Sequence, residues 1–292
     1  MHQFLCAIGL GSLKNKKEMM PVIAIAIENG QRTTYYSAFS KTNLAEYRYT
    51  YGEKAGITVC GEFVEDDDFH VDYYFPYIEP TYVSSTADIS LRMLADKNTY
   101  LGLCEDPRVG VSLIFFLQNS LEYRKLIEQN AYQITGNSLM LVGLAAEGSI
   151  LLPLQKSKQA RELISQKSKK RNEQIMAAKD GDMEARQALN LEDMDTMSDV
   201  ARRMYKEDIY SFVDESFMPS GLESDQYSVL VEILQVEELV APLSKKELYY
   251  LTVVYNTMVF SILIDKNDLN GEPAKGRRFK GTIWLQGYMV TQ

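Results

Sequence analysis

A basic stretch at residues 154–179 constrains the fold more than any other feature, because it separates two regions with strand-like patterns. Its few apolar residues are Ala160, Leu163, Ile164 and Ile175. They form a stripe too thin for a fully packed helix. A chain of 292 residues is long enough for one large domain or two modest ones. We therefore predict an α+β protein with an N-terminal α+β domain (1–153), a helical charged connector (154–216) and a β-rich C-terminal domain (217–292).

The N-terminal domain is predicted to begin with helices and to continue as a mainly antiparallel sheet. Helical spacing extends through the first thirty residues and stops at Asn29-Gly30. Two β-rich runs at 57–64 and 69–75 follow, joined by an acidic turn, and this pattern is typical of a hairpin. A short helix is expected to begin at Asn119 or Ser120. Further strand-like runs lie at residues 89–94, 100–104, 109–117, 138–146 and 149–152.

The connector is predicted to be helical, and the C-terminal domain to be a small antiparallel sheet or barrel. The basic helix should end near Gly181, which suits a helix C-terminus, and Asp182 suits the N-cap of the next helix. Two more short helices are expected, one near residues 185–189 and another near 197–204. The expected C-terminal strands are residues 227–236, 248–256, 258–264 and 282–290.

The chain carries 40 acidic against 31 basic side chains, a formal net charge of -9. Nucleic-acid phosphates and anionic membranes repel such a chain on average, so only a local basic patch could bind them. No run approaches the roughly 18 apolar residues that cross a bilayer, and the N-terminus lacks the pattern of a secretory signal. Cys6, Cys60 and Cys104 form no C-x-x-C pair, which predicts reduced, buried thiols. We therefore expect a cytoplasmic protein with no membrane partner.

The acidic hairpin turn offers the first candidate site. Asp66, Asp68 and His70 lie close together there, and carboxylates with an imidazole can bind a hard cation or transfer protons. Consecutive aspartates are also typical of a solvated turn, which is the interpretation we favour. His2 and His70 are the only histidines, which leaves few schemes for histidine-based catalysis. No dinucleotide, P-loop or nucleophile-elbow motif is complete, so we predict no catalytic residue and no cofactor.

A basic cluster near the C-terminus is the second candidate site. Arg277, Arg278 and Lys280 precede Trp284 and Gln286 in a region rich in glycine. Small barrels often bind strands of nucleic acid through a basic rim and aromatic platforms. The alternative is that Trp284 belongs to the core and that the charges offset nearby acidic residues. These five residues are the predicted binding residues.

Several segments spread along the whole chain resemble a family of functionally uncharacterised proteins, a domain of unknown function from Clostridia-type bacteria. The segments are MHQFLCAIG (1–9), VGVSLIFFLQN (109–119), LEDMD (191–195), FMP (217–219), DQYS (225–228), GEPAKGRRFKG (271–281) and IWLQG (283–287). The resemblance implies a bacterial cytoplasmic protein of this size. It implies no activity, cofactor or site.

No motif for chemistry is complete, so the leading hypothesis is a non-enzymatic binding or interaction protein. Its contact surface would lie on the C-terminal domain, and its partner would be another protein. One alternative is a nucleic-acid-binding protein that uses the basic loop and the basic helix. The other is a metal- or carboxylate-dependent enzyme at the acidic hairpin.

Overall fold

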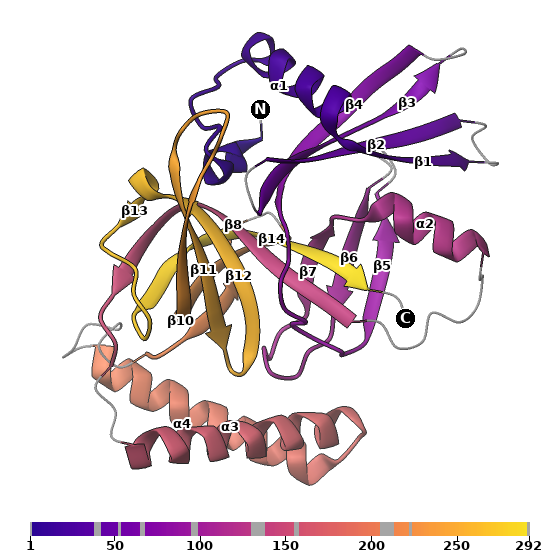
Figure 1. The fold of residues 1–292 in the computed structure, drawn as a ribbon. Helices are drawn as coiled ribbons and strands as arrows, with labels where there is room; N and C mark the ends of the chain where they lie inside the picture. The colour runs from indigo at the N-terminus through magenta and orange to yellow at the C-terminus, as the bar shows by residue number, and fades with distance from the viewer. Residues whose placement is uncertain are drawn as a thin grey trace.

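The computed structural model describes residues 2–37, 42–51, 54–64, 68–94, 99–129, 138–154, 158–204, 213–221 and 224–290. Within these ranges the protein is of mixed α+β class, as predicted. A four-stranded antiparallel sheet lies at the N-terminal side, and a ten-stranded sheet closes in part into a barrel. Figure 1 shows the N-terminal sheet and α1 above the barrel, with the helical pair α3 and α4 below it.

The N-terminal module is a short 3-10 helix, an α-helix and the four-stranded sheet. Its elements are η1 (Gln3–Ile8), α1 (Lys16–Asn29), β1 (Gln31–Ser37), β2 (Thr42–Tyr51), β3 (Ala55–Val64) and β4 (Asp68–Ile78). Asn15 caps α1 by accepting a hydrogen bond from the backbone N–H of Glu18. Helix α1 packs its apolar face, which includes Met19 and Ile23, against one face of the sheet. The predicted hairpin is confirmed, because β3 and β4 pair antiparallel as far as Val64 and Asp68.

The middle of the chain supplies three strands at one edge of the larger sheet, β5 to β7, and the barrel strand β8. The elements are β5 (Ile89–Met93), β6 (Tyr100–Cys104), β7 (Leu113–Leu117), α2 (Ser120–Gln129) and β8 (Ser138–Leu151). Strand β7 begins later than predicted, because Asp106 and Gly110 (φ 75°) lie in a turn before it. The two strands expected at 138–146 and 149–152 are one continuous strand, β8.

The connector forms two helices, α3 (Lys158–Lys179) and α4 (Met183–Met204), which contact each other along their length. Gly181, with φ 100°, ends the first helix, and the Asp182 carboxylate accepts from the backbone N–H groups of Glu184 and Ala185. The expectation of two short helices after Gly181 is wrong. Neither glycine nor proline occurs between 183 and 204, so one helix continues through both segments.

The C-terminal strands close a barrel with β8. The elements are β9 (Ser216–Pro219), β10 (Gln226–Val240), β11 (Glu247–Tyr255), β12 (Met258–Asp265), η3 (Lys266–Asp268), β13 (Leu269–Asn270) and β14 (Arg278–Val290). The predicted β-rich C-terminal region is confirmed. Strands β8, β12, β11, β10 and β14 form the closed ring, in which only β8 and β12 run parallel to each other.

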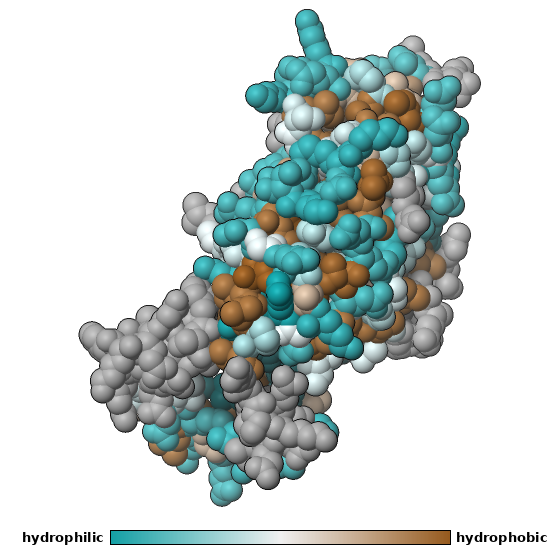
Figure 2. Space-filling model, turned by 60° about the vertical axis from the view of Figure 1, so that its left-hand side comes forward, coloured by the Kyte–Doolittle hydropathy of each residue, from teal (hydrophilic) through white to brown (hydrophobic). Residues whose placement is uncertain are grey.

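Strands from both sides of the helical pair therefore share one barrel core. Phe279, Ile283 and Leu285 of β14 pack there against apolar residues of β8 and β10 to β12. The predicted domain limits at 153/154 and 216/217 stay a prediction. On the surface shown in Figure 2, hydrophobic residues form separate patches among hydrophilic ones. No helix among the described residues is long and apolar enough to cross a membrane.

Candidate functional site: a polar cavity below the N-terminal sheet

The site begins with the alternation of residues along β2. Tyr47 and Tyr51 point to the side of the sheet that carries η1 and α1, and the Tyr51 hydroxyl donates to the carbonyl oxygen of Ile8 at 2.9 Å. Successive side chains of a strand point to opposite faces. Glu46 and Arg48 therefore point to the other face of the sheet, toward α2 and β14.

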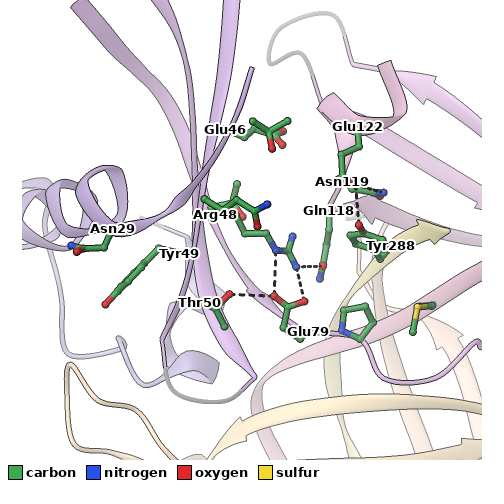
Figure 3. Close-up of a pocket in the computed structure, with 15 residues that line it drawn as sticks. Asn29, Glu46, Arg48, Tyr49, Thr50, Glu79, Gln118, Asn119, Glu122 and Tyr288 are labelled. Carbon is green, nitrogen blue, oxygen red and sulfur yellow. Dashed lines mark hydrogen bonds and ion pairs between the residues drawn. The ribbon is translucent and has the colours of Figure 1, made fainter. Parts of the chain in front are cut away.

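A cavity of about 540 Å³ lies on this second face. Its walls come from the end of α1, strands β1, β2 and β3, the segment after β4, the start of α2, strand β8 and the end of β14, and Figure 3 shows ten of the lining residues labelled. The volume is within the range of small-molecule sites. The residues that line it include Asn29, Gln31, Thr33, Glu46, Arg48, Thr50, Thr58, Glu79, Gln118, Asn119, Glu122 and Tyr288.

Arg48 occupies the centre of the wall. Its Nη2 lies 3.2 Å from Oε2 of Glu79 and 3.3 Å from Oε1 of Gln118, as the dashed lines in Figure 3 mark. Its guanidinium also stacks on the ring of Tyr77, 3.7 Å from the centroid. The planar group is held by an ion pair, an amide and an aromatic face, so its position is fixed before any ligand arrives.

Glu46 is the most strongly perturbed acid of the cavity. Burial raises the pKa of its carboxyl to about 8, and the charge of Glu122 adds to the rise. Arg48, the Cys60 thiol and the backbone N–H of Leu121 oppose this shift without cancelling it. Glu46 is therefore mostly protonated at neutral pH and presents a neutral carboxyl, which is both a donor and an acceptor.

The thiol behind Glu46 is not a nucleophile at neutral pH. Burial raises the pKa of Cys60 well above its usual value. Only the thiolate form of cysteine is strongly nucleophilic. The chemistry of the cavity therefore belongs to its carboxyls and to Arg48.

Two side-chain amides hold the start of α2 against β14. Gln118 donates to the carbonyl oxygen of Ile78 at 3.2 Å and to Oε1 of Gln286 at 2.7 Å. Asn119 exchanges two hydrogen bonds with the backbone of Met289. Tyr288 donates from its hydroxyl to Glu122 at 2.9 Å. These contacts fix the wall of the cavity that faces Arg48.

The lining favours a ligand with hydrogen-bond donors and positive charge. Arg48 and Glu79 neutralise each other, and Glu46 is mostly uncharged, so Glu122 leaves the wall with a net negative charge. Thr58, which also lines the cavity, has a buried hydroxyl with no hydrogen-bond partner among the described residues. Among those residues no group of three His, Cys, Asp or Glu side chains could hold a metal ion.

The structure distributes the five predicted binding residues among different environments. Arg278 is buried and donates to the carbonyl oxygens of Leu152 and Val213, and burial lowers its pKa. Arg277 donates to the carbonyl oxygen of Glu272, and Lys280 is half-buried on β14.

The other two predicted residues lie inside the protein. Trp284 is buried at a separate cavity, and Gln286 is fully buried, where it donates to the carbonyl oxygen of Pro76 at 2.8 Å. Only Gln286, through Gln118, touches the wall of the polar cavity. Binding by the predicted five remains a prediction, and they do not share one exposed surface.

The acidic hairpin is brought together only in part. Asp68 and His70 are exposed, with Oδ2 and Nε2 3.1 Å apart, while Asp66 lies outside the described residues. Sequence reasoning missed Glu46 and Arg48, although a signal was present. Charged or hydroxyl residues alternate with tyrosines from 46 to 51, which is typical of a strand with one polar face.

The chain belongs to the family described as "Domain of unknown function, E. rectale Gene description (DUF3881)", which it matches over residues 5–287. This match confirms the near full-length resemblance predicted from the sequence. No curated protein and no solved structure matches the chain. Activity must therefore be argued from the cavity itself.

Proposed function

We propose that this member of the family is a binding protein that takes a small molecule with a positively charged amine into the polar cavity. The observation that carries the proposal is Glu46, a buried carboxyl with a pKa raised to about 8, in a cavity wall of net negative charge. Perturbed acids inside a well-formed cavity are typical of functional sites.

An amine suits this wall better than an anion does. An anionic ligand would have to compete with Glu79 for Arg48 and would meet Glu122 as a like charge. An ammonium group can donate to Glu79, Glu122 and Glu46, and its charge is also attracted by the aromatic face of Tyr288.

Binding of an amine should release a proton from Glu46. Before binding, the buried carboxyl is mostly protonated at pH 7. A positive charge nearby favours its ionised form and lowers its pKa. Up to one proton per bound ligand should therefore leave the protein, which a purely structural carboxyl would not do.

Calorimetric titration with putrescine at pH 7, in phosphate and in Tris, tests this. We expect saturable binding whose measured heat differs between the two buffers, because the released proton is taken up by the buffer. The matched ligand is 1,4-butanediol, which has the same carbon chain and no charge, and it should bind at least roughly ten-fold more weakly. Equal binding of the diol, or no binding of putrescine, would contradict the proposal.

Glu46→Gln keeps the shape of the neutral carboxyl but cannot ionise. We expect it to weaken putrescine binding by roughly ten-fold and to abolish the difference between buffers. Glu173→Gln, an exposed glutamate on α3, is the matched control and should behave as the unmodified protein. Unchanged proton release in Glu46→Gln would assign the release to another group.

The same observation favours general acid catalysis as a second candidate function. A carboxyl that stays protonated near pH 7 can donate a proton to a bound molecule, and the charge of Glu122 supports that state. Prolonged incubation with putrescine, followed by mass spectrometry, separates the two functions. A new product that Glu46→Gln does not form would show catalysis, and intact putrescine would leave binding as the function.

A further inference from the structure

A second cavity, of about 520 Å³, lies between the N-terminal module and the larger sheet. It shares no lining residue with the polar cavity. Strand β14 contributes Tyr288 to the polar cavity and Trp284 to the second one. Gln286 lies between them and is fully buried. We name the second space the aromatic cavity, lined by His2, Gln3, Phe4, Tyr73, Tyr74, Phe75, Leu94, Thr99, Leu101, Phe116, Ser224, Asp225, Gln226 and Trp284.

Aromatic rings form much of its wall around Trp284. The ring of His2 lies 4.3 Å from the indole, that of Phe116 5.1 Å and that of Phe4 5.9 Å, between centroids. Phe75 continues this cluster, 4.8 Å from Phe116. Phe4, Phe75 and Trp284 are buried, so a flat aromatic molecule would stack on the partly exposed rings of the lining, those of His2, Tyr73, Tyr74 and Phe116.

Asp225 gives the aromatic wall a charged, anchored edge. Its Oδ2 accepts from the indole N–H of Trp284 at 2.7 Å, and its carbonyl oxygen accepts from the backbone N–H of Leu285 at 2.9 Å. Among the described residues, the lining includes no lysine or arginine. This edge therefore favours N–H groups and positive charge over phosphate or carboxylate groups.

A buried hydroxyl group in the wall of the aromatic cavity indicates that the ligand has a polar group at its edge. Thr99 lines the cavity and is buried, and its hydroxyl has no hydrogen-bond partner within the described part of the chain. Buried polar groups normally have a partner, supplied by the protein, by water or by a ligand. A purely hydrocarbon ligand would leave this hydroxyl unpaired.

We propose that the aromatic cavity binds a flat nitrogen heteroaromatic molecule that is uncharged or positively charged. The ring would stack on the partly exposed side chains of Phe116, Tyr73 and Tyr74, beside Trp284, and its N–H edge would face Asp225. The cavity volume lies within the range of sites for such molecules. This site uses residues different from those of the proposed amine site, so either can fail without the other.

The fluorescence of Trp284 reports directly on this cavity, because it is the only tryptophan of the chain. The full protein is titrated with adenosine and with nicotinamide, each beside its anionic counterpart, AMP and nicotinate. We expect saturable quenching by at least one of the uncharged pair and roughly ten-fold or weaker binding of the matched anion. No saturable change with either uncharged ligand, or equal binding of the anions, would overturn the proposal.

Two variants test the contacts. Asp225→Asn keeps an acceptor for the indole N–H and removes the charge, so it should reduce the preference for the uncharged ligand over its anion. Phe116→Leu removes a stacking face and should weaken binding, whereas Phe63→Leu, on β3 outside the cavity, should not. Thermal unfolding confirms that each variant is folded before titration. An unchanged preference in a folded Asp225→Asn protein would overturn the role of the carboxylate.

Discussion

Two buried carboxyls in this protein have pKa values shifted in opposite directions, one by burial and one by hydrogen bonds. Burial alone would raise the pKa of Asp106, but hydrogen bonds from Arg108 and from the Ser85 hydroxyl, at 2.6 Å, outweigh it and lower the pKa. Burial raises the pKa of Glu46 to about 8, and Arg48, whose guanidinium is paired with Glu79, opposes the rise without cancelling it. At neutral pH Asp106 is therefore ionised and holds its neighbours by charge, whereas Glu46 keeps a proton that it can release.

The raised pKa of Glu46 makes the stability of the protein depend on pH. The folded state holds this proton up to about pH 8, whereas the unfolded chain releases it near 4.5. The folded protein therefore binds more protons between these values, and its stability falls as pH rises, by about 1.4 kcal/mol per pH unit for one group. We expect Glu46→Gln to gain roughly 2–3 kcal/mol relative to the unmodified protein between pH 5 and 7.

Urea unfolding at a series of pH values measures this difference. Glu173→Gln, the exposed control, should follow the unmodified protein at every pH. If the stability difference between Glu46→Gln and the unmodified protein did not change with pH, the carboxyl would be ionised throughout, and the proposed proton release would lose its basis.

Single residues show why the site was harder to predict than the fold. Glu46 and Arg48 lie in a run that correctly indicates a strand with one polar face, and such a face normally contacts solvent. Here α2 and β14 cover it, and their residues are more than 70 positions away. Trp284 was predicted as a binding residue with core as the alternative, and the structure places it buried at the edge of a cavity.

At the scale of elements, local patterns predicted most strands and helices. The β3–β4 hairpin and the C-terminal strands followed from alternation and from turn residues between them. Errors arose where a boundary depends on contacts made elsewhere. Strand β8 passes through Gly148 without interruption because β14 pairs with it on both sides of that glycine.

Gly61 shows how closely the β3–β4 hairpin is packed. It lies at a β-bulge, and a Cβ atom there would overlap the carbonyl oxygen of His70 on the neighbouring strand. We expect Gly61→Ala to destabilise the protein by about 1–3 kcal/mol, because backbone must move to make room. Val64→Ala, at an exposed position of the same strand, should change stability by about 0.5 kcal/mol or less. Equal effects in urea unfolding would contradict the assigned bulge.

At the scale of the whole molecule, the barrel joins parts that the sequence separates by the helical connector. Strand β14 pairs with β8 from Ser138 to Leu151 and also with β7 and β10. Hydrophobic periodicity is local and carries no information on which distant strands pair. The prediction of a C-terminal sheet or barrel was correct. Residue spacing could not show that β8, which precedes the helical connector, is one of the barrel strands.

This shared barrel predicts how fragments of the chain behave. Residues 1–153 expressed alone should expose the edges of β7 and β8 and aggregate or remain unfolded, and residues 217–292 should lack β8. Mixing the two fragments should restore a complex with the sheet content of the intact protein. Size-exclusion chromatography and circular dichroism measure this, and a stable monomeric 1–153 fragment would contradict it.

The pairing of β8 with β14 also sets an order of events during synthesis. The ribosome makes β8 before the helical pair and before every other strand of the barrel, and β14 is the last of these elements. Until β14 emerges, β8 lacks its antiparallel partner in the barrel, and the barrel is an open sheet with apolar residues exposed. The nascent chain therefore carries an unfinished sheet while the helical pair and the remaining barrel strands are synthesised, and it is most open to aggregation during that time.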